Sequence, residues 1–311
     1  MRIPEPARMS GSSRRDRFGW FVALPIGVLV AVLLVLPGGS LLPTVRPWLG
    51  LAVPPLLLIL LWRRSRPALL AGLLPLAAWS AVFGGHLLPD GDVPHDLVVV
   101  QHNVSDENPD PAATVRTLIA DDPDLVALEE ITPEAVPAYT AAFPAEYAHH
   151  TIHGTVALWS RHPLTEAAPL DIRPAGLGDD WNRGLRAVAR TPQGDIAVYV
   201  AHLSSVRPGL TGLDTARRDD SARKLGAALT AEPHERVILL GDLNATATDP
   251  GLDPVTAHLG TDGSDFAFTF PAALPIARID HVLARSLTVT AVRTLPRTGS
   301  DHIPIVARLR H

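Results

Sequence analysis

A sharp change of composition near residue 89 divides this chain into two parts that must fold in different surroundings. From residue 18 to residue 88 the sequence is dominated by Leu, Val, Ala, Pro and Gly, and only four arginines carry charge. From residue 90 onward charged residues are frequent, and turn-forming residues separate short apolar runs. We therefore expect the first part to lie in a lipid bilayer and the second to fold as a globular domain in water.

Three apolar runs in the first part are predicted to form transmembrane helices, at about residues 18–37, 43–62 and 68–88. The first run has about 20 residues, which at about 1.5 Å per residue cross about 30 Å of hydrocarbon. The second is the weakest because Pro54 and Pro55 interrupt it, and without it the globular domain would face the cytoplasm. A secretory signal would need a shorter apolar core and an Ala-x-Ala-like site, and neither is present.

The arginines around these runs predict their orientation. Five arginines lie in residues 1–17, and Arg63, Arg64 and Arg66 lie between the second and third runs, whereas only Arg46 lies between the first and second. Basic segments stay on the cytoplasmic side, so residues 1–17 form a cytoplasmic tail. Three crossings then place residues 90–311 outside the cell, in a multi-pass protein of the plasma membrane.

Charge and cysteine content limit the function of the second part. Residues 1–89 hold nine basic and two acidic residues, which leaves 18 basic and 30 acidic residues in 90–311, a net charge of −12. Such a domain repels polyanions, so binding to long nucleic acids is disfavoured. The chain contains no cysteine, which excludes disulfides, thiolate metal sites and cysteine nucleophiles.

The pattern of residues 90–311 predicts an α+β fold. Short β-branched runs such as 96–101, 124–128 and 237–240 are typical of buried strands, and residues 111–121 and 213–229 have helical patterns. Residues 185–190 and 195–201 are expected to form a hairpin. We expect a four-layer α/β sandwich, in which two packed, mostly antiparallel sheets are flanked by helices, preceded by the three transmembrane helices.

Polar residues collect at the ends of these predicted strands. Any one of them has an ordinary structural explanation, because Asn and Asp are common in turns. As a set, carboxylates, amides and histidines suit a hard divalent cation and a phosphate, and a water nucleophile needs a nearby carboxylate base. The set comprises His102, Asn103, Glu129, Glu130, His202, Asp242, Asn244, Asp280, His281, Ser300, Asp301 and His302.

From about residue 96 to residue 309 the chain resembles the endonuclease/exonuclease/phosphatase superfamily in the order and spacing of seven short motifs. That resemblance implies a four-layer sandwich fold and metal-dependent hydrolysis of phosphoester bonds by water. The motifs are Val100-Gln101-His102-Asn103-Val104, Pro123 to Glu130, Gly154 to Arg161, Ala201-His202-Leu203, Gly241-Asp242-Leu243-Asn244, Arg278-Ile279-Asp280-His281 and Gly299-Ser300-Asp301-His302.

The resemblance also implies a metal site that binds Mg²⁺, with Mn²⁺ as the alternative. Glu130 would be the principal ligand, Asn103 would lie beside it on the metal or the phosphate, and Asp301 would assist His302 or hold a second metal. The superfamily usually carries Gln where this chain has Glu129, and the alignment selects Glu130 as the ligand.

Five further residues would carry the chemistry by the same resemblance. Asp242 would orient or deprotonate the attacking water, and Asn244 would hold that water or the phosphate. His202 and His302 would contact the phosphoryl oxygens, and Asp280 would hold His302 in its tautomer.

Three other features of the sequence lie outside these motif roles. Arg186 is a candidate substrate contact, with a strand-surface charge as the alternative. His149, His150 and His153 lie with no motif residue and are expected at a solvated edge. Residues 176–184, which include Trp181-Asn182-Arg183, are expected to border the substrate cleft.

The predicted membrane region favours a lipid-linked phosphate or pyrophosphate as the substrate, similar to undecaprenyl pyrophosphate, at the outer face of the membrane. The three-span arrangement also resembles actinobacterial membrane proteins associated with resistance to teicoplanin-type glycopeptides. The alternatives are an anchored extracellular nuclease or phosphodiesterase, and a membrane-tethered binding protein without turnover. The oligomeric state stays open.

The orientation can be tested with a reporter that is active only outside the cytoplasm. Alkaline phosphatase fused after residue 88 should be active, because an odd number of crossings would export it. A fusion after residue 64, in the predicted cytoplasmic loop, is the matched control and should be inactive. The opposite pattern would contradict the predicted orientation.

Overall fold

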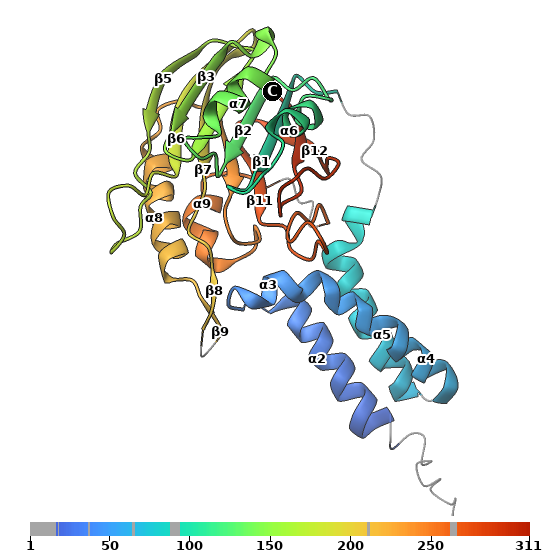
Figure 1. Ribbon diagram of the computed structural model, residues 1–311. Helices are drawn as coiled ribbons and strands as arrows, with labels where there is room; N and C mark the ends of the chain where they lie inside the picture. The colour runs from blue at the N-terminus through green and yellow to red at the C-terminus, as the bar shows by residue number, and fades with distance from the viewer. Residues whose placement is uncertain are drawn as a thin grey trace, which may run out of the picture. The chain divides into compact units, whose positions relative to one another are not determined.

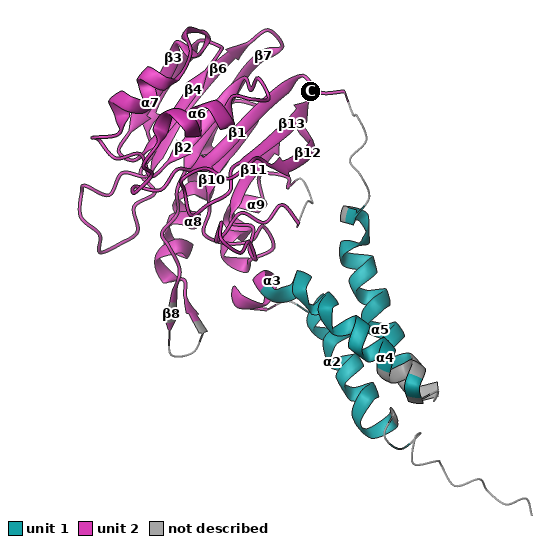
Figure 2. Cartoon of the chain, turned by 45° about the vertical axis from the view of Figure 1, so that its right-hand side comes forward, with its two compact units in different colours: residues 1–37, 45–88 teal, residues 38–44, 89–311 magenta. Residues whose placement is uncertain are grey.

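The computed structural model describes residues 17, 19–36, 38–63, 66–87, 94–209, 212–261 and 266–311. The chain forms two compact units (Figure 2). Unit 1 comprises residues 1–37 and 45–88, and unit 2 comprises residues 38–44 and 89–311. The main boundary between the units therefore coincides with the change of composition at residue 89.

Unit 1 is helical. Its elements are η1 (Gly19–Ala23), α2 (Leu24–Val35), η2 (Arg46–Ala52), α4 (Val53–Arg63), α5 (Arg66–Phe83) and η3 (Gly84–Leu87). Helices α2 and α5 pack closely, because a Cβ atom on Gly27 would lie only 2.2 Å from the carbonyl oxygen of Ala71. A residue larger than glycine at this position would push the two helices apart.

Of the described residues, one helix, Leu41–Leu58, is long and apolar enough to cross a membrane. Two further apolar helices, Trp20–Val35 and Leu70–Phe83, are shorter than a full span. The prediction of three spanning helices is therefore not confirmed. The ends of the predicted spans at residues 18 and 37, and at residue 88, lie outside the described residues.

Unit 2 contains two large sheets and one small hairpin (Figure 1). The first sheet has the strand order β12 (Thr288–Thr294), β13 (Ile305–Arg310), β1 (Leu97–Asn103), β2 (Leu125–Glu129), β4 (Val156–Ser160) and β3 (His149–His153). The second has the order β11 (Asp280–Arg285), β10 (Val237–Asp242), β7 (Gly194–Ala201), β6 (Gly184–Thr191) and β5 (Leu164–Pro169). Strands β8 (Arg207–Gly209) and β9 (Gly212–Asp214) form the hairpin.

Each large sheet contains one parallel strand pair, β1 with β2 and β7 with β10, and its other pairs are antiparallel. The expected pair of mostly antiparallel sheets is therefore confirmed. The two parallel pairs matter for function, because parallel neighbours end at the same edge of a sheet. Residues that follow β1 and β2, or β7 and β10, are thereby brought close together.

The sheets face each other across an apolar core that includes Val99, Ala127, Val198 and Leu240. Helices α6 (Pro111–Leu118) and α7 (Val136–Ala142) cover the outer face of the first sheet, through a cluster that includes Leu118. Helices α8 (Ala216–Ala231) and α9 (Asp253–Thr256) cover the outer face of the second. Unit 2 is thus an α+β sandwich of two sheets flanked by helices, as predicted from the sequence.

The local sequence explains where α6 begins. The side chain of Asp110 accepts a hydrogen bond from the backbone N–H of Ala113 at 2.9 Å, and Pro111 occupies the first turn. Helix α8 begins at Ala216 and not at residue 213 as predicted, because Gly212–Asp214 pair with β8. The predicted hairpin of residues 185–190 and 195–201 is present as β6 and β7.

Gly241 allows β10 to approach β7 where both strands end. A Cβ atom on Gly241 would lie 1.9 Å from the carbonyl oxygen of Ala201, which is a backbone atom and cannot move aside. Gly241→Ala should therefore destabilise the protein by about 1–3 kcal/mol, the range of overpacked interiors, and lower its thermal midpoint.

The matched control is Gly260→Ala, since a Cβ atom on Gly260 would lie 3.5 Å from its nearest neighbour, the Ala284 carbonyl oxygen. Thermal unfolding followed by circular dichroism should show a loss only for Gly241→Ala. Equal midpoints for the two variants would contradict the close approach of the strands.

Candidate active site

The alternation of side chains along the strands places a polar cluster at the end of the core between the sheets. On β1, Leu97 and Val99 face that core, so Asn103 shares the same face. On β10, Leu240 faces it, and Asp242 follows two residues later. Gln101, Glu129 and Asp280 face the same core, because each lies an even number of residues from a core-facing residue of its own strand.

Two residues reach the cluster because the backbone turns sharply at the end of a strand. Glu130 follows β2 with a φ of 62°, and Asn244 lies just beyond β10 with a φ of 50°. This left-handed conformation is unfavourable for residues other than glycine and costs about 1–3 kcal/mol where it is imposed. The left-handed residue ends the strand in each case. The Oε1 atom of Glu130 then lies 3.8 Å from Nε2 of His202.

The adjacent carboxyl groups of Glu129 and Glu130 lie in different environments. Glu129 is fully buried, and its Oε2 accepts a hydrogen bond from Nε2 of Gln101 at 2.8 Å. Burial, together with the negative charges of Asp280 and Asp242, raises the pKa of Glu129 well above its usual value. The side chain of Glu130 is 27% exposed. Glu130 is therefore the carboxylate of the two that can meet a ligand from solvent.

Asp242 lies at the centre of the cluster. Its Oδ2 accepts a hydrogen bond from Nδ2 of Asn103 at 3.1 Å, and its Oδ1 accepts one from the backbone N–H of Asn244 at 2.9 Å. The Nε2 atoms of His202 and His302 lie 3.6 and 3.7 Å from Oδ2 of Asp242. Two histidines, two amides and one carboxylate thus converge from the ends of separate strands.

Asp280 and His302 form a buried ion pair, with Oδ2 of Asp280 2.8 Å from Nδ1 of His302. Gln101 donates a second hydrogen bond to Oδ1 of Asp280 at 2.9 Å. Although burial opposes ionisation of both groups, the charge of His302 lowers the pKa of Asp280 to about 2, and that of Asp280 raises the pKa of His302 to about 10. The pair is therefore ionised at neutral pH.

Asp242 and His202 differ from this ion pair in their pKa values. Burial, and then the negative charge of Asp280, raise the pKa of Asp242 to about 7. Burial, and then the cation of Arg183, lower the pKa of His202 well below its usual value, so His202 is neutral. The cluster thus combines a carboxylate that exchanges its proton near neutral pH with one cationic and one neutral imidazole.

The remaining predicted residues are placed as follows. The side-chain amide of Asn244 donates to the carbonyl oxygen of Leu203 at 3.0 Å, which ties the segment after β10 to that after β7. Asp301 is exposed beside His302, and its carbonyl oxygen accepts a hydrogen bond from Ala272 at 2.6 Å. His281 lies buried, and its Nε2 is 2.8 Å from the carbonyl oxygen of Ala245.

Arg186, predicted as a substrate contact, does not join the cluster. Its guanidinium binds both carboxylate oxygens of the buried Glu232, at 2.8 and 2.9 Å, and it also pairs with Glu166. The Arg186 side chain is on the face of β6 that also carries Tyr199 across the pair with β7, and Tyr199 donates to the same Glu232. The sequence does not show which face of β6 carries this side chain, so its ion pair with Glu232 could not be predicted.

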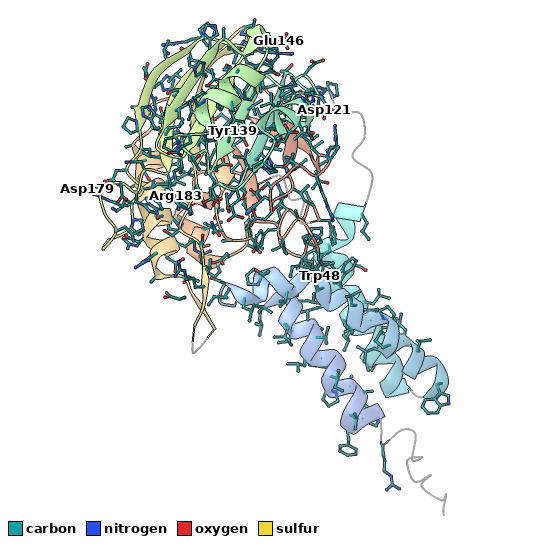
Figure 3. The ribbon with its side chains drawn as sticks, in the orientation of Figure 1. Trp48, Asp121, Tyr139, Glu146, Asp179 and Arg183 are labelled. Carbon is teal, nitrogen blue, oxygen red and sulfur yellow. The ribbon has the colours of Figure 1, made fainter. Side chains whose placement is uncertain are left out.

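Three residues of the site have contacts and roles that the sequence did not assign. Arg183, labelled in Figure 3, lies at the end of the domain away from Glu146, with its Nη1 3.3 Å from both ring nitrogens of His202. Ser300 Oγ donates to the carbonyl oxygen of Asn103 at 2.7 Å and accepts from the backbone N–H of His302 at 2.9 Å. Gln101 was counted as part of a strand, although polar residues inside an apolar strand are a signal of such networks.

The donors of this cluster suit a hard divalent cation. Glu130, Asp242 and Asn103 offer carboxylate and amide oxygens, the ligands that Mg²⁺ prefers. Asp242, Asp280 and His302 also lie close enough for one ion, with candidate ligand atoms within 4.8 Å of one another. Asp280 and His302 already bind each other, and Glu130 is the carboxylate that can reach a metal from solvent.

The sequence profile of the Endonuclease/Exonuclease/phosphatase family matches residues 100–302. The chain belongs to this family. The family comprises phosphodiesterases, phosphatases and nucleases, so membership supports hydrolysis of phosphoester bonds as the activity of this protein. The matched range includes every residue of the cluster from Asn103 to His302. No curated protein matches the chain.

Solved structures share the fold at low sequence identity. Sphingomyelinase C from Streptomyces griseocarneus is 20% identical with a TM-score of 0.52, and the match covers 70% of this chain and 99% of that one. D. rerio TDP2 complexed with a single-strand DNA product is 17% identical with a TM-score of 0.55, covering 69% and 99%. A beta toxin mutant from Staphylococcus aureus with bound magnesium ions is 15% identical with a TM-score of 0.53, covering 68% and 99%.

The Asp280–His302 pair predicts a definite dependence of stability on pH. The folded pKa of His302, about 10, lies above its ordinary value of 6.5, so its contribution is complete below pH 6.5 and is lost as the pH rises toward 10. The folded pKa of Asp280, about 2, lies below 3.8, so its contribution is lost as the pH falls from 3.8 toward 2. The difference in thermal midpoint between wild type and Asp280→Asn should be largest between pH 3.8 and pH 6.5 and should become smaller toward pH 10.

The comparison is made in metal-free buffer with Asp195→Asn as the control, since Asp195 pairs with Arg190 at the exposed end of the β6–β7 hairpin. The control should differ little from wild type at every pH. A constant midpoint difference for Asp280→Asn from pH 5 to pH 9.5 would argue against an ionised pair.

Proposed function

We propose that this protein is a membrane-anchored, Mg²⁺-dependent phosphoesterase that hydrolyses a lipid-linked phosphate ester or pyrophosphate at the outer face of the membrane. The observation that carries the proposal is the convergence of Glu130, Asp242, Asn103, His202 and the Asp280–His302 pair at one end of the sandwich core. Oxygen donors for a metal, a base for water and donors for a phosphate lie together there.

Glu130 and Asn103 would hold the metal. When bound, Mg²⁺ would supply Lewis-acid neutralisation of phosphoryl charge at this end of the domain. The fold also occurs in a beta toxin with bound magnesium ions, which supports this choice of cation.

The side chains of this chain account for the remaining requirements of the hydrolysis. Asp242, with a pKa near 7, can accept a proton from the attacking water, and the Asn244 N–H orients its carboxylate. The His302 imidazolium, held by Asp280, would stabilise negative charge that develops on the phosphoryl oxygens. Neutral His202 can donate one hydrogen bond to the same group.

A lipid-linked substrate is supported by the apolar helices of unit 1 and by an apolar loop beside the site. The loop of residues 270–277 carries Leu274, which is 70% exposed, and Ile276, which is 44% exposed. It begins at Phe270, whose ring centroid lies 4.8 Å from that of His302. Apolar side chains next to a phosphoesterase site are suited to the hydrocarbon part of a substrate. A role in glycopeptide resistance through a cell-wall lipid belongs to this proposal.

An anchored nuclease or phosphodiesterase is the second candidate, because the fold also occurs in TDP2 with a DNA product. The net charge of −12 in residues 90–311 speaks against long nucleic acids. Purified protein assayed with Mg²⁺ on plasmid DNA and on a polyprenyl pyrophosphate would separate the two candidates. Cleavage of DNA alone would favour the nuclease.

The two neighbouring glutamates give a sharp test of the metal assignment. Glu130→Gln should lower kcat/KM by about 100-fold or more because a charged oxygen ligand is lost, and excess Mg²⁺ should restore part of the activity. Glu129→Gln should change kcat/KM by less than about threefold, because Gln still accepts the hydrogen bond from Gln101 without introducing charge.

Both variants are assayed as purified full-length protein over a Mg²⁺ titration, with thermal melting to show that each is folded. Full activity in Glu130→Gln, or a greater loss in Glu129→Gln, would reject Glu130 as the ligand.

A further inference from the structure

Arg183 lies against the catalytic cluster and forms no ion pair with an acidic residue among those that the structure describes. Its Nη1 is 3.3 Å from both Nδ1 and Nε2 of His202, and its Cζ is 5.3 Å from the ring centroid of Trp181. Equal distances to both ring nitrogens place Nη1 over the face of the imidazole and not in line with either lone pair. An Nη1–H group thus points at the imidazole of His202, and the Trp181 ring lies within the range of a cation–π contact. The other guanidinium nitrogens form no hydrogen bond to the described residues.

The backbone on both sides of Arg183 is held firmly. The Arg183 carbonyl oxygen accepts a hydrogen bond from the backbone N–H of His202 at 2.9 Å, and the Asn182 carbonyl oxygen accepts one from Thr155 at 3.1 Å. Gly154 permits this contact, because a Cβ atom there would lie 2.0 Å from the Asn182 oxygen. The cation is therefore fixed in position before any ligand arrives.

The lack of a counter-charge sets Arg183 apart from its neighbours. Arg173, Arg186 and Arg190 each pair with a carboxylate. Within the described part of the chain, the hydrogen bonds of the Arg183 side chain go only to His202, which is neutral. In a domain with a net charge of −12, an unneutralised guanidinium beside the active site is suited to an anionic group of the substrate.

The geometry separates this anion from the phosphoryl group that is attacked. Nε2 of His202 lies 3.8 Å from Oε1 of Glu130 and 3.6 Å from Oδ2 of Asp242, where the attacking water and the reacting phosphorus belong. Arg183 lies against the same imidazole ring. A group bound by Arg183 would therefore be adjacent to the reacting phosphoryl group.

We propose that Arg183 binds a second phosphoryl group of the substrate, directly bonded to the one attacked, so that the site selects diphosphate esters over monophosphates. This inference rests on the proposed phosphoesterase function. In the reaction, the water oxygen bonds to the terminal phosphorus while the bond from that phosphorus to the bridging oxygen breaks. A proton from water passes to Asp242, and the bridging oxygen leaves with the organic monophosphate, whose added charge faces Arg183.

The test compares two substrates that share one alcohol, farnesyl diphosphate and farnesyl monophosphate, with bis(4-nitrophenyl) phosphate as a general phosphodiester. The full-length protein is purified in detergent and assayed with Mg²⁺. Arg183→Gln should lower kcat/KM for the diphosphate by about 10- to 100-fold, the worth of a charge-assisted hydrogen bond, mainly through KM. The other substrates should lose less, so that the ratio of kcat/KM for the diphosphate to that for the monophosphate falls. Arg183→Lys should recover part of the loss, because it keeps the charge but not the planar fork.

Inhibition provides a measurement that does not depend on diphosphate turnover. Inorganic pyrophosphate should inhibit hydrolysis of bis(4-nitrophenyl) phosphate more strongly than inorganic phosphate does, and Arg183→Gln should raise the inhibition constant of pyrophosphate by about tenfold and leave that of phosphate unchanged. Arg190→Gln is the matched control, because Arg190 is an exposed arginine of β6, the strand that follows Arg183.

The outcomes distinguish the inference from the function on which it rests. Equal losses on all substrates in a variant that melts like wild type, or unchanged inhibition by pyrophosphate, would overturn the role of Arg183. A wild-type protein that hydrolyses the monophosphate or diester but not the diphosphate would also overturn it. Wild-type protein inactive on every substrate with Mg²⁺ would instead reject the proposed phosphoesterase function.

Discussion

The buried ion pair between Asp280 and His302 is the interaction on which the rest of the site depends. Carboxylates at the end of an apolar core are stable only with partners, because an unpaired buried charge is very unfavourable. Here His302 neutralises Asp280, Gln101 donates to both Asp280 and Glu129, and burial raises the pKa of Glu129. This division of charge leaves Asp242 as the buried carboxylate that titrates near neutral pH.

The site contains strained backbone that lowers the stability of the protein locally, and the packing of the surrounding fold must offset this strain. Glu130 and Asn244 hold left-handed backbones, and Gly241 brings two strands so close that no side chain fits between them. Strained residues of this kind commonly occur at functional sites, where the packed scaffold imposes them. The core between the two sheets supplies that scaffold, and the site lies at its end, on strands and on residues that directly follow or precede them.

Much of the fold and most of the candidate site could be predicted from the sequence, and the errors have a common cause. The strand ends at Asn103, Glu129 and Asp242 were found because short apolar runs end there in polar residues. The contact of Arg186 with Glu232 and the roles of Arg183 and Ser300 could not be assigned from the sequence, because they depend on partners from other strands. The three predicted membrane-spanning helices were not confirmed, because among the described residues one helix is long and apolar enough to span, and apolar composition does not reveal where a helix breaks.

By itself the sequence determined the division at residue 89, the alternation of strands and helices, the family and the set of polar residues at strand ends, because all of these are local or ordered along the chain. Only the tertiary structure decided that Glu130 and not Glu129 faces solvent, that Asp280 binds His302, and that Arg183 lies on His202 without a counter-charge. These depend on the register and facing of strands far apart in sequence. A shift of one residue in a strand would reverse the face of every side chain on it.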